Sequence, residues 1–248
     1  MTDEELLHVL NAAAGAVRGA LDGLADWGPA GTRPGQYRSD LVADEAALRV
    51  LDAAGLGVLS EESGDHNRDR DFLVALDPVD GSTNASRRLP WYATSLCLLD
   101  GDGPRVGLVV NLATGDRYEA IRGAGARHNG EAMGPTASTT MSDALVGVVG
   151  YPGQHLGWRQ VRALGAAALD LCAVATGQLD AFIDCSPAGH APWDYLAGML
   201  ICQEVGAPVV DRTGRELVVR TAAERRSPIA AATPSLLEEA VAARAAAG

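Results

Sequence analysis

Two carboxylates followed by a glycine and two hydroxyl side chains form the segment of this sequence best suited to chemistry. The segment runs from Asp77 to Asn84 in the order Asp-Pro-Val-Asp-Gly-Ser-Thr-Asn, directly after the apolar run Phe72 to Leu76. The proline restricts the residue before it to extended geometry, and Gly81 allows the backbone to turn sharply. We therefore expect the carboxylates of Asp77 and Asp80 to face the same cavity.

This combination suits a divalent cation bound against a phosphate. Carboxylate oxygens are preferred ligands of Mg²⁺. If Gly81 to Asn84 open a helix, its free N–H groups would point at a phosphate held by the cation. The same residue types are also the commonest turn formers, so the alternative is an ordinary surface turn.

Two further acidic segments favour the metal site over the turn. Gly57 to Ser60 is predicted to be a short strand that ends at Glu61 and Glu62, and Asp194 precedes an apolar helical stretch. All three acidic segments lie where strands or loops give way to other elements. Such junctions are where α/β proteins place ligand sites.

Together these segments resemble the inositol monophosphatase family, a group of lithium-sensitive, magnesium-dependent sugar-phosphate phosphatases. The family's central pattern is met at Asp77 to Asn84, its Glu-Glu-Ser element at Ser60 to Ser63, and its Trp-Asp pattern at Trp193 to Gly198. The resemblance implies an α/β fold with an α+β N-terminal lobe, built as a layered α-β-α-β-α sandwich. It also implies an active site between an antiparallel N-terminal sheet and a smaller α/β C-terminal lobe.

The resemblance further implies which residues would hold metal and substrate. One Mg²⁺ would be bound by Glu61, Asp77 and the Val79 carbonyl, and a second by Asp77, Asp80 and Asp194. A catalytic set would activate the attacking water and protonate the leaving group: Glu61, Ser82, Asp80 and Asp194. The phosphate and the organic part of the substrate would contact Asp80, Gly81, Ser82, Gly165, Ala166, Asp184 and Asp194.

Four features leave alternatives open. Asp44 either reaches a third, weaker Mg²⁺ through water or is an ordinary acidic residue near a helix start. The segment Cys185 to His190 is longer than the family's usual spacing, so Asp184 either contacts a substrate hydroxyl or marks a changed substrate. His190, near Trp193, either contacts the substrate or is a structural residue of its loop, and a lone histidine in a loop is more often structural. Arg87 and Arg88 either aid phosphate capture or are solvated.

Hydrophobic patterning predicts the elements that must position these residues. The chain is expected to form one catalytic unit of residues 1–248, with an N-terminal lobe of about 1–140 and a C-terminal lobe of about 141–248. The stretch from Asp65 to Asp71 is expected to be a solvated loop. Helices are expected at 4–21, 43–54, 165–176, 195–205 and from 235, and strands at 57–60, 72–76, 92–99, 105–112, 117–121, 145–149, 181–184, 208–210 and 229–232.

Composition narrows the class of protein. The 248 residues are 47% hydrophobic, enough for one sizeable core. A net charge of −12 without any lysine argues against a nucleic-acid groove, and an acidic protein that handles phosphate needs metal to reverse the local sign. No stretch resembles a signal peptide or a membrane span, and the four scattered cysteines suit buried thiols in a reducing cytoplasm.

The sequence thus predicts a cytoplasmic, Mg²⁺-dependent phosphomonoesterase that acts on a small polyol or sugar phosphate, with inositol monophosphate as first choice. Histidinol-phosphate phosphatase and fructose-1,6-bisphosphatase are the enzymatic alternatives. A regulatory protein that senses metal and phosphate with the same pocket is the non-enzymatic one. By the same resemblance we expect a homodimer inhibited by lithium. The acidic composition and the lack of a long apolar stretch predict that the protein has no nucleic-acid or membrane partners.

Overall fold

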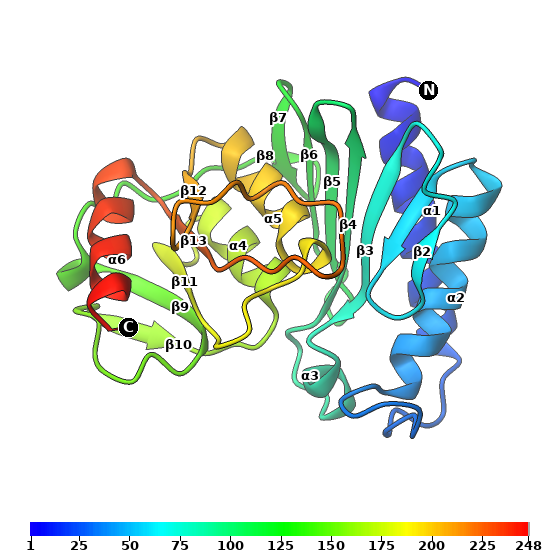
Figure 1. Ribbon diagram of the computed structural model, residues 1–248, viewed down its shortest axis with the longest axis horizontal. Coiled ribbons are helices and arrows are strands. Elements are labelled where there is room, and N and C mark those ends of the chain that lie inside the picture. Colours follow the sequence, from blue (N-terminus) through cyan, green and yellow to red (C-terminus); the bar gives the residue numbers. More distant parts are fainter. Residues whose placement is uncertain (248) are drawn as a thin grey trace.

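Five alternating layers of helices and sheets make up the computed structural model, which describes residues 1–247 (Figure 1). Helices α1 (Asp3–Asp22) and α2 (Arg38–Ala53) cover one face of an eight-stranded sheet. The central layer holds α4 (Ala167–Ala175) and α5 (Pro192–Glu204). A five-stranded sheet and α6 (Pro234–Ala246) follow. The predicted α-β-α-β-α order is confirmed.

The eight-stranded sheet carries most of the acidic motif. Its order is β2-β1-β3-β4-β5-β6-β7-β8, and its pairs are antiparallel except for β1 and β3, which run parallel. The strands are β1 (Gly57–Ser60), β2 (Gly64–His66), β3 (Leu73–Asp80), β4 (Ala93–Asp100), β5 (Gly103–Asn111), β6 (Arg117–Ile121), β7 (Gly125–His128) and β8 (Glu131–Ala132).

The five-stranded sheet has the order β10-β9-β11-β13-β12. The strand β9 pairs in parallel with β10 and β11, whereas β13 pairs antiparallel with β11 and β12. The strands are β9 (Leu145–Gly150), β10 (Gln160–Arg162), β11 (Ala181–Cys185), β12 (Val209–Asp211) and β13 (Pro228–Ala231), and a 3-10 helix spans Met141–Asp143.

Burial explains why the two kinds of helix differ in sequence. The helix α1 buries one face that includes Leu6, Leu10 and Val17, and Thr2 accepts a hydrogen bond from the Glu5 backbone at its start. The helix α5 lies between the two sheets, so its residues from Tyr195 to Cys202 are all buried. A helix enclosed on both sides has no need of a polar face.

Several expected boundaries were wrong, and three of the differences have a clear local cause. The helix α2 begins five residues before the predicted Ala43, because the Tyr37 N–H donates to the Asp40 carboxylate at 2.8 Å and starts the helix there. Proline at the first position starts α5 at residue 192. The stretch expected to be a solvated loop supplies part of β2, which pairs with β1 as the edge strand of the sheet.

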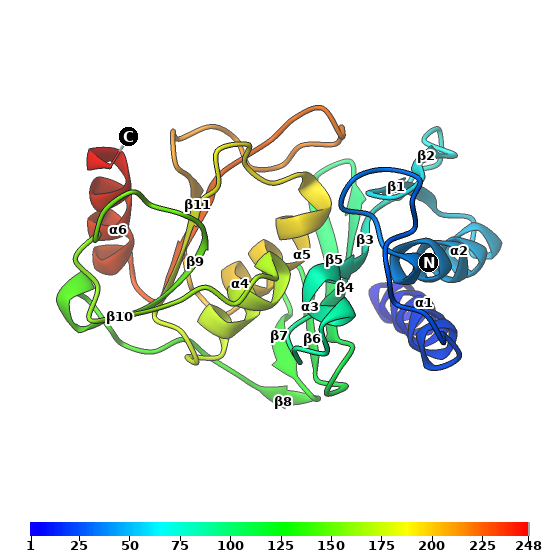
Figure 2. The ribbon, with the colours of Figure 1, turned by 90° about the horizontal axis from the view of Figure 1, so that it is seen from below.

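One segment of the second half reaches back to the first sheet. Residues 212–227, which connect β12 to β13, cross from the second sheet towards the first, as Figure 2 shows in orange. The Arg220 guanidinium donates to the Asp100 carbonyl, and the Arg68 guanidinium donates to the Arg220 carbonyl. Among residues 1–247 there is no helix both long and apolar enough to span a bilayer.

Candidate active site

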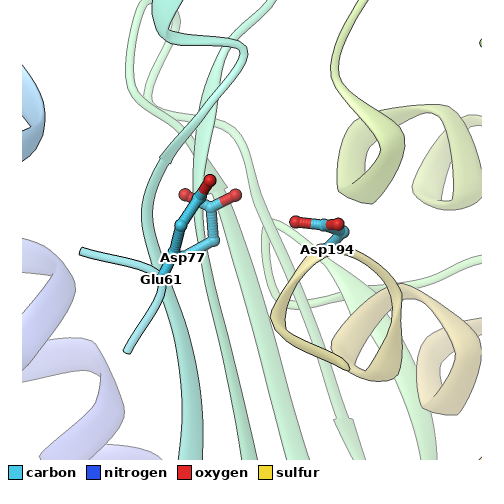
Figure 3. A group of neighbouring side chains, drawn as sticks. All are labelled: Glu61, Asp77 and Asp194. Carbon is cyan, nitrogen blue, oxygen red and sulfur yellow. The ribbon is translucent and has the colours of Figure 1, made fainter. Parts of the chain in front are cut away.

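Carboxylates from three distant segments meet between the first sheet and the central helices. Glu61 follows β1, Asp77 lies in β3, and Asp194 lies in the first turn of α5. One oxygen from each carboxylate lies within 4.8 Å of the other two. Figure 3 shows Asp194 facing Glu61 and Asp77 from the opposite side of the gap. Among the described residues, this is the only group of three or more His, Cys, Asp or Glu side chains spaced closely enough to hold a metal ion.

Strand pairing explains how the first two carboxylates come together. The strands β1 and β3 run parallel with Ser60 opposite Leu76, and the Glu61 N–H continues the ladder by donating to the Leu76 carbonyl at 3.0 Å. The residue that follows Ser60 is Glu61, and the residue that follows Leu76 is Asp77, so the strand pairing places these two acidic residues side by side. The Val79 N–H donates to the Asp77 carboxylate at 3.0 Å, which holds that side chain against its own backbone.

A hydrogen bond from the neighbouring strand brings α5 to the same place. Ser95 on β4 pairs with Asp77, and its hydroxyl donates to the Trp193 carbonyl at 2.8 Å. The Asp194 carboxylate accepts from the Ala191 N–H at 2.8 Å, so it also caps the start of α5. The start of the buried helix is thereby fixed beside β3.

Asp80 lies at the end of β3, where the pairing with β4 is irregular between Asp77 and Asp80. Its carboxylate accepts from the Ala168 N–H at 2.8 Å, at the start of α4. It is not part of the group of three. Burial, followed by the charge of Asp194, raises the pKa of Asp80 to about 8. Asp80 therefore lies within electrostatic reach of the group.

The glycine of the motif allows a close approach of three chain segments. Gly81 has φ +84°, and a β-carbon there would lie 3.0 Å from the Trp91 carbonyl oxygen and 3.1 Å from both Ala166 Cβ and the Gly165 carbonyl oxygen. Side chains rarely tolerate this backbone region. Gly81 starts the short helix α3 (Ser82–Ser86), so the predicted substrate residues of both segments are neighbours.

Asn84 joins the same segments. Its side-chain amide donates to the Trp91 carbonyl at 2.8 Å and to the Leu164 carbonyl at 2.7 Å. Ser82 is half-buried. Because Ser82 is the first residue of α3, its backbone N–H has no acceptor within the helix. The last residue of the motif thus fixes the loop before α4 against the turn.

The negative charges of the three carboxylates are unfavourable in their buried positions, so a bound cation would stabilise them. Burial raises the pKa of Glu61 to about 8, with further contributions from the charges of Asp194 and Glu62. Burial also raises the pKa of Asp77 well above its ordinary value and that of Asp194 in the same direction. Carboxylates that face one another in a low dielectric are stabilised by a bound cation, and a hard divalent ion suits their oxygen atoms.

Two further acidic residues, Glu62 and Asp44, are hydrogen-bonded to the segment that carries Glu61. The Glu62 side chain is only 5% exposed and pairs with Arg33 at 2.7 Å, while Gln36 also donates to it. Asp44 is buried in α2 and accepts a hydrogen bond from the Ser60 hydroxyl, which in turn accepts from the Glu62 N–H at 3.0 Å. Asp44 is outside the group of three, and its role as a metal ligand stays a prediction.

Asp184 and Asp170 are both fully buried, and the sequence had singled out only Asp184. Asp184, at the end of β11, is fully buried and lies 3.2 Å from the His190 ring. Asp170 on α4 is also buried and accepts from the Trp91 indole N–H at 2.8 Å. Burial raises the pKa of Asp170 to about 7. A single Asp in an apolar helix gives no signal of such a position.

Comparison with known proteins agrees with this geometry. The model of the "Inositol monophosphatase family" matches residues 39–248. A protein of Archaeoglobus fulgidus, "Fructose-1,6-bisphosphatase/inositol-1-monophosphatase", is 34% identical over 88% of each chain. The Mycolicibacterium smegmatis protein "Inositol-1-monophosphatase ImpA" is 31% identical over 78% of this chain and 74% of its own. The structure of inositol monophosphatase from Anabaena superposes with a TM-score of 0.80 at 25% identity, covering 97% of this chain and 95% of that one.

Proposed function

Because this chain belongs to the inositol monophosphatase family, we propose that it is a Mg²⁺-dependent phosphatase that hydrolyses inositol monophosphate. The proposal rests chiefly on one observation, the convergence of Glu61, Asp77 and Asp194 within 4.8 Å. A buried acidic group beside a turn suited to phosphate fits a cation and its phosphate ester better than it fits a structural role.

Each carboxylate has a distinct part in the proposed mechanism. Glu61 and Asp77, adjacent across the β1–β3 pair, would hold the cation from the sheet side, and Asp194 would hold it from α5. Asp80 would complete the ligand set while its second oxygen stays on the Ala168 N–H. A bound divalent cation supplies charge neutralisation at the phosphoryl oxygens and at the leaving oxygen.

The protein's own groups would orient the reacting atoms. Glu61 and the Ser82 hydroxyl would align the attacking water and accept its proton, since Ser82 starts α3 next to the Gly81 turn. The unpaired N–H groups at that turn would contact the phosphate. Asp194 would position the water that returns a proton to the leaving alkoxide.

The choice of substrate follows from the relatives and remains part of the proposal. Two similar proteins carry inositol-1-monophosphatase in their names, and one of these also carries fructose-1,6-bisphosphatase. Both substrates are small polyol or sugar phosphates, so one site of this type suits either. Inositol monophosphate is the first choice because both names include it.

A panel of phosphate esters tests the proposal. Purified protein is assayed for phosphate release from myo-inositol 1-phosphate, fructose 1,6-bisphosphate, histidinol phosphate and p-nitrophenyl phosphate, with Mg²⁺ and with excess chelator. We expect hydrolysis only with Mg²⁺, and the highest kcat/KM for myo-inositol 1-phosphate. Highest activity on another ester would change the substrate, whereas no hydrolysis of any ester with Mg²⁺ would refute the enzyme itself.

A further inference from the structure

One buried carboxylate lies in the apolar helix α4, outside the acidic group of the active site. Every residue of α4 from Ala167 to Ala175 is buried, and Asp170 is fully enclosed among them. Its Oδ2 atom has no hydrogen-bond partner among residues 1–247. Burying a carboxylate in apolar surroundings costs free energy, so its presence in the middle of this helix needs a physical reason.

The side chain of Asp170 is hydrogen-bonded to a distant loop. The Trp91 indole N–H donates to Asp170 Oδ1 at 2.8 Å, and the two residues are 79 positions apart in the chain. Trp91 lies in the loop between α3 and β4, and its half-buried side chain packs against the hydrophobic cluster that contains α4. The hydrogen bond therefore fixes the direction of the indole and joins this loop to α4.

The backbone of Trp91 contacts the turn proposed to bind phosphate. Its carbonyl oxygen accepts from the Asn84 side-chain amide at 2.8 Å. The same oxygen would lie 3.0 Å from a β-carbon at Gly81. Trp91 thus touches both the first and the last residue of the segment from Gly81 to Asn84. The turn is packed against a residue whose side chain is held by Asp170.

The helix α4 also meets this turn directly. The Ala168 N–H donates to the Asp80 carboxylate at 2.8 Å, and Ala166 Cβ would lie 3.1 Å from a β-carbon on the glycine of the turn. The Asp170 N–H donates to the Ala166 carbonyl at 3.0 Å, so Asp170 belongs to the same first turn of the helix. One helical turn therefore holds Asp80 through its backbone and Trp91 through a side chain.

We propose that Asp170 is a positioning residue for phosphate: by fixing the Trp91 indole, it keeps the Trp91 carbonyl against the turn and directs the free N–H groups of that turn at the phosphoryl oxygens. This inference rests on the proposed phosphatase function. Asp170 itself touches no substrate, because it is fully buried. Its role needs a hydrogen-bond acceptor at Oδ1 rather than a negative charge, since the indole donor is neutral.

Two variants of Asp170 separate the hydrogen bond from the charge. Asp170→Asn keeps an oxygen that accepts from the indole, whereas Asp170→Ala removes it. Both variants remove the carboxylate charge, which adds to burial and to the charge of Asp194 in raising the pKa of Asp80. A difference in phosphate affinity between D170A and D170N therefore appears at equal net charge.

The probe is inorganic phosphate, used as a competitive inhibitor with Mg²⁺ present. We expect its inhibition constant to be about tenfold higher in D170A than in D170N, the loss of one hydrogen bond that orients the turn. D170N should stay within about threefold of the wild type. In D170A the KM for myo-inositol 1-phosphate and for p-nitrophenyl phosphate should rise by the same factor, because both esters present a phosphate to the turn. The kcat should change less than about threefold, as expected when ground-state and transition-state binding weaken together.

Trp91→Phe tests the same hydrogen bond from the other side, because it removes the indole donor but keeps an aromatic ring. W91F should weaken phosphate inhibition as D170A does. The double variant W91F/D170A should be no worse than the weaker single variant, since both changes break one bond. Trp158→Phe is the control. Trp158 is buried in a separate hydrophobic cluster that includes part of α6, and no hydrogen bond joins its indole to residues 1–247, so W158F should keep phosphate affinity within about twofold.

Thermal unfolding with and without Mg²⁺ separates positioning from a structural role. Weakened phosphate inhibition in D170A and W91F, with the Mg²⁺-dependent rise in Tm retained, would support the inference. A lowered Tm in D170A with phosphate inhibition equal to that of D170N would show a merely structural carboxylate and overturn it. Weakened inhibition together with a lost Mg²⁺ response would show a general loss of the site and would overturn it as well.

The inference stays testable if the cavity left in D170A prevents folding. W91F then decides alone: unchanged phosphate inhibition overturns the inference, and weakened inhibition with an intact Mg²⁺ response supports it. All these outcomes leave the phosphatase function in place. Wild-type protein that hydrolyses none of the esters with Mg²⁺ would instead overturn the proposed function, and the inference with it.

Discussion

At the scale of single residues, the proposed chemistry depends on carboxylates whose buried negative charges are unfavourable unless a cation is bound beside them. Asp80 illustrates the balance. One of its oxygens is held by the Ala168 N–H, while burial and the charge of Asp194 raise its pKa to about 8. The backbone contact fixes the direction of the side chain, and only the second oxygen stays free to contact a ligand. Under the proposed mechanism, we therefore expect the charge of Asp80 to matter more for catalysis than the shape of its side chain.

Replacing Asp80 by Asn tests this at minimal structural cost. The amide oxygen of Asp80→Asn still accepts from the Ala168 N–H, so the melting temperature should change little. Loss of the charge should lower kcat by about a hundredfold or more, because the interaction is needed most in the transition state. Steady-state kinetics with saturating Mg²⁺ measure it. The matched control is D102N, in the exposed turn after β4, which should keep wild-type activity. A kcat of D80N above a tenth of the wild-type value would contradict the role assigned to Asp80.

At the scale of elements, the site depends on the junction of β3 and α3. Gly81 turns the chain in a left-handed conformation, and the segments at Trp91 and at Gly165 to Ala166 pack against its α-carbon. Asn84 then bonds to both segments. The turn is therefore a packing point between the first sheet and the central helices, as well as a change of chain direction.

A methyl group at this turn should disturb both stability and activity. Gly81→Ala must adopt φ +84° and place Cβ about 3 Å from three neighbours. We expect the free energy of unfolding to fall by about 1–3 kcal/mol. Urea denaturation measures it, with Gly101→Ala as the control.

Gly101 has open space where a β-carbon would lie, with no heavy atom within 4 Å, and its φ is not positive. G101A should therefore change the free energy of unfolding by less than about 0.5 kcal/mol. Phosphatase activity should fall in G81A and persist in G101A. Equal stability of the two variants would contradict the expected crowding of a β-carbon at position 81.

At the scale of the whole molecule, the site links layers that are otherwise separate. Glu61 and Asp77 belong to the first sheet, whereas Asp194 belongs to a helix of the central layer. Residues 212–227 form a second connection between the two sheets, since Arg220 in this segment donates to the Asp100 carbonyl. The two ends of the segment are held together by the Asp211 carboxylate, which accepts from the N–H groups of Thr213 and Ser227. A bound cation would add a direct cross-link between sheet and helix.

This cross-link should appear in thermal unfolding and should depend on pH. The folded-state pKa values of Glu61 and Asp80 are raised to about 8 from unfolded values near 4. Their stabilising contribution is therefore complete below about pH 4 and is lost as pH rises towards 8. The metal-free protein should melt at a lower temperature at pH 8 than at pH 5, and Mg²⁺ should raise Tm more at pH 8.

Differential scanning fluorimetry at both pH values, with Mg²⁺ or with chelator, measures this. The Asp77→Asn variant removes one of the converging charges, so its Tm should depend less on pH and respond less to Mg²⁺. A Mg²⁺ effect of the same size at pH 5 and pH 8 would contradict the coupling between the carboxylates and the cation.

Much of the fold could be predicted because it depends on local patterns. The strands at 57–60 and 117–121 were predicted with the boundaries that the structure has, since alternating or continuous apolar runs between turn residues specify them. The strand β2 and the edge strand β10 could not be predicted. Both are short and polar, and they form because a neighbouring strand offers unpaired backbone groups.

The sequence by itself determined the acidic motifs, their order and the turn at Gly81, because these depend on residue type and on a few neighbouring dihedral angles. Only the tertiary structure decided that Glu61, Asp77 and Asp194 meet, and that Asp184 lies beside His190. The physical reason is that these distances depend on strand register, on the Ser95 hydrogen bond to α5 and on the packing of the segment before Asp194. Contacts between residues so far apart in the chain have no signature in local sequence.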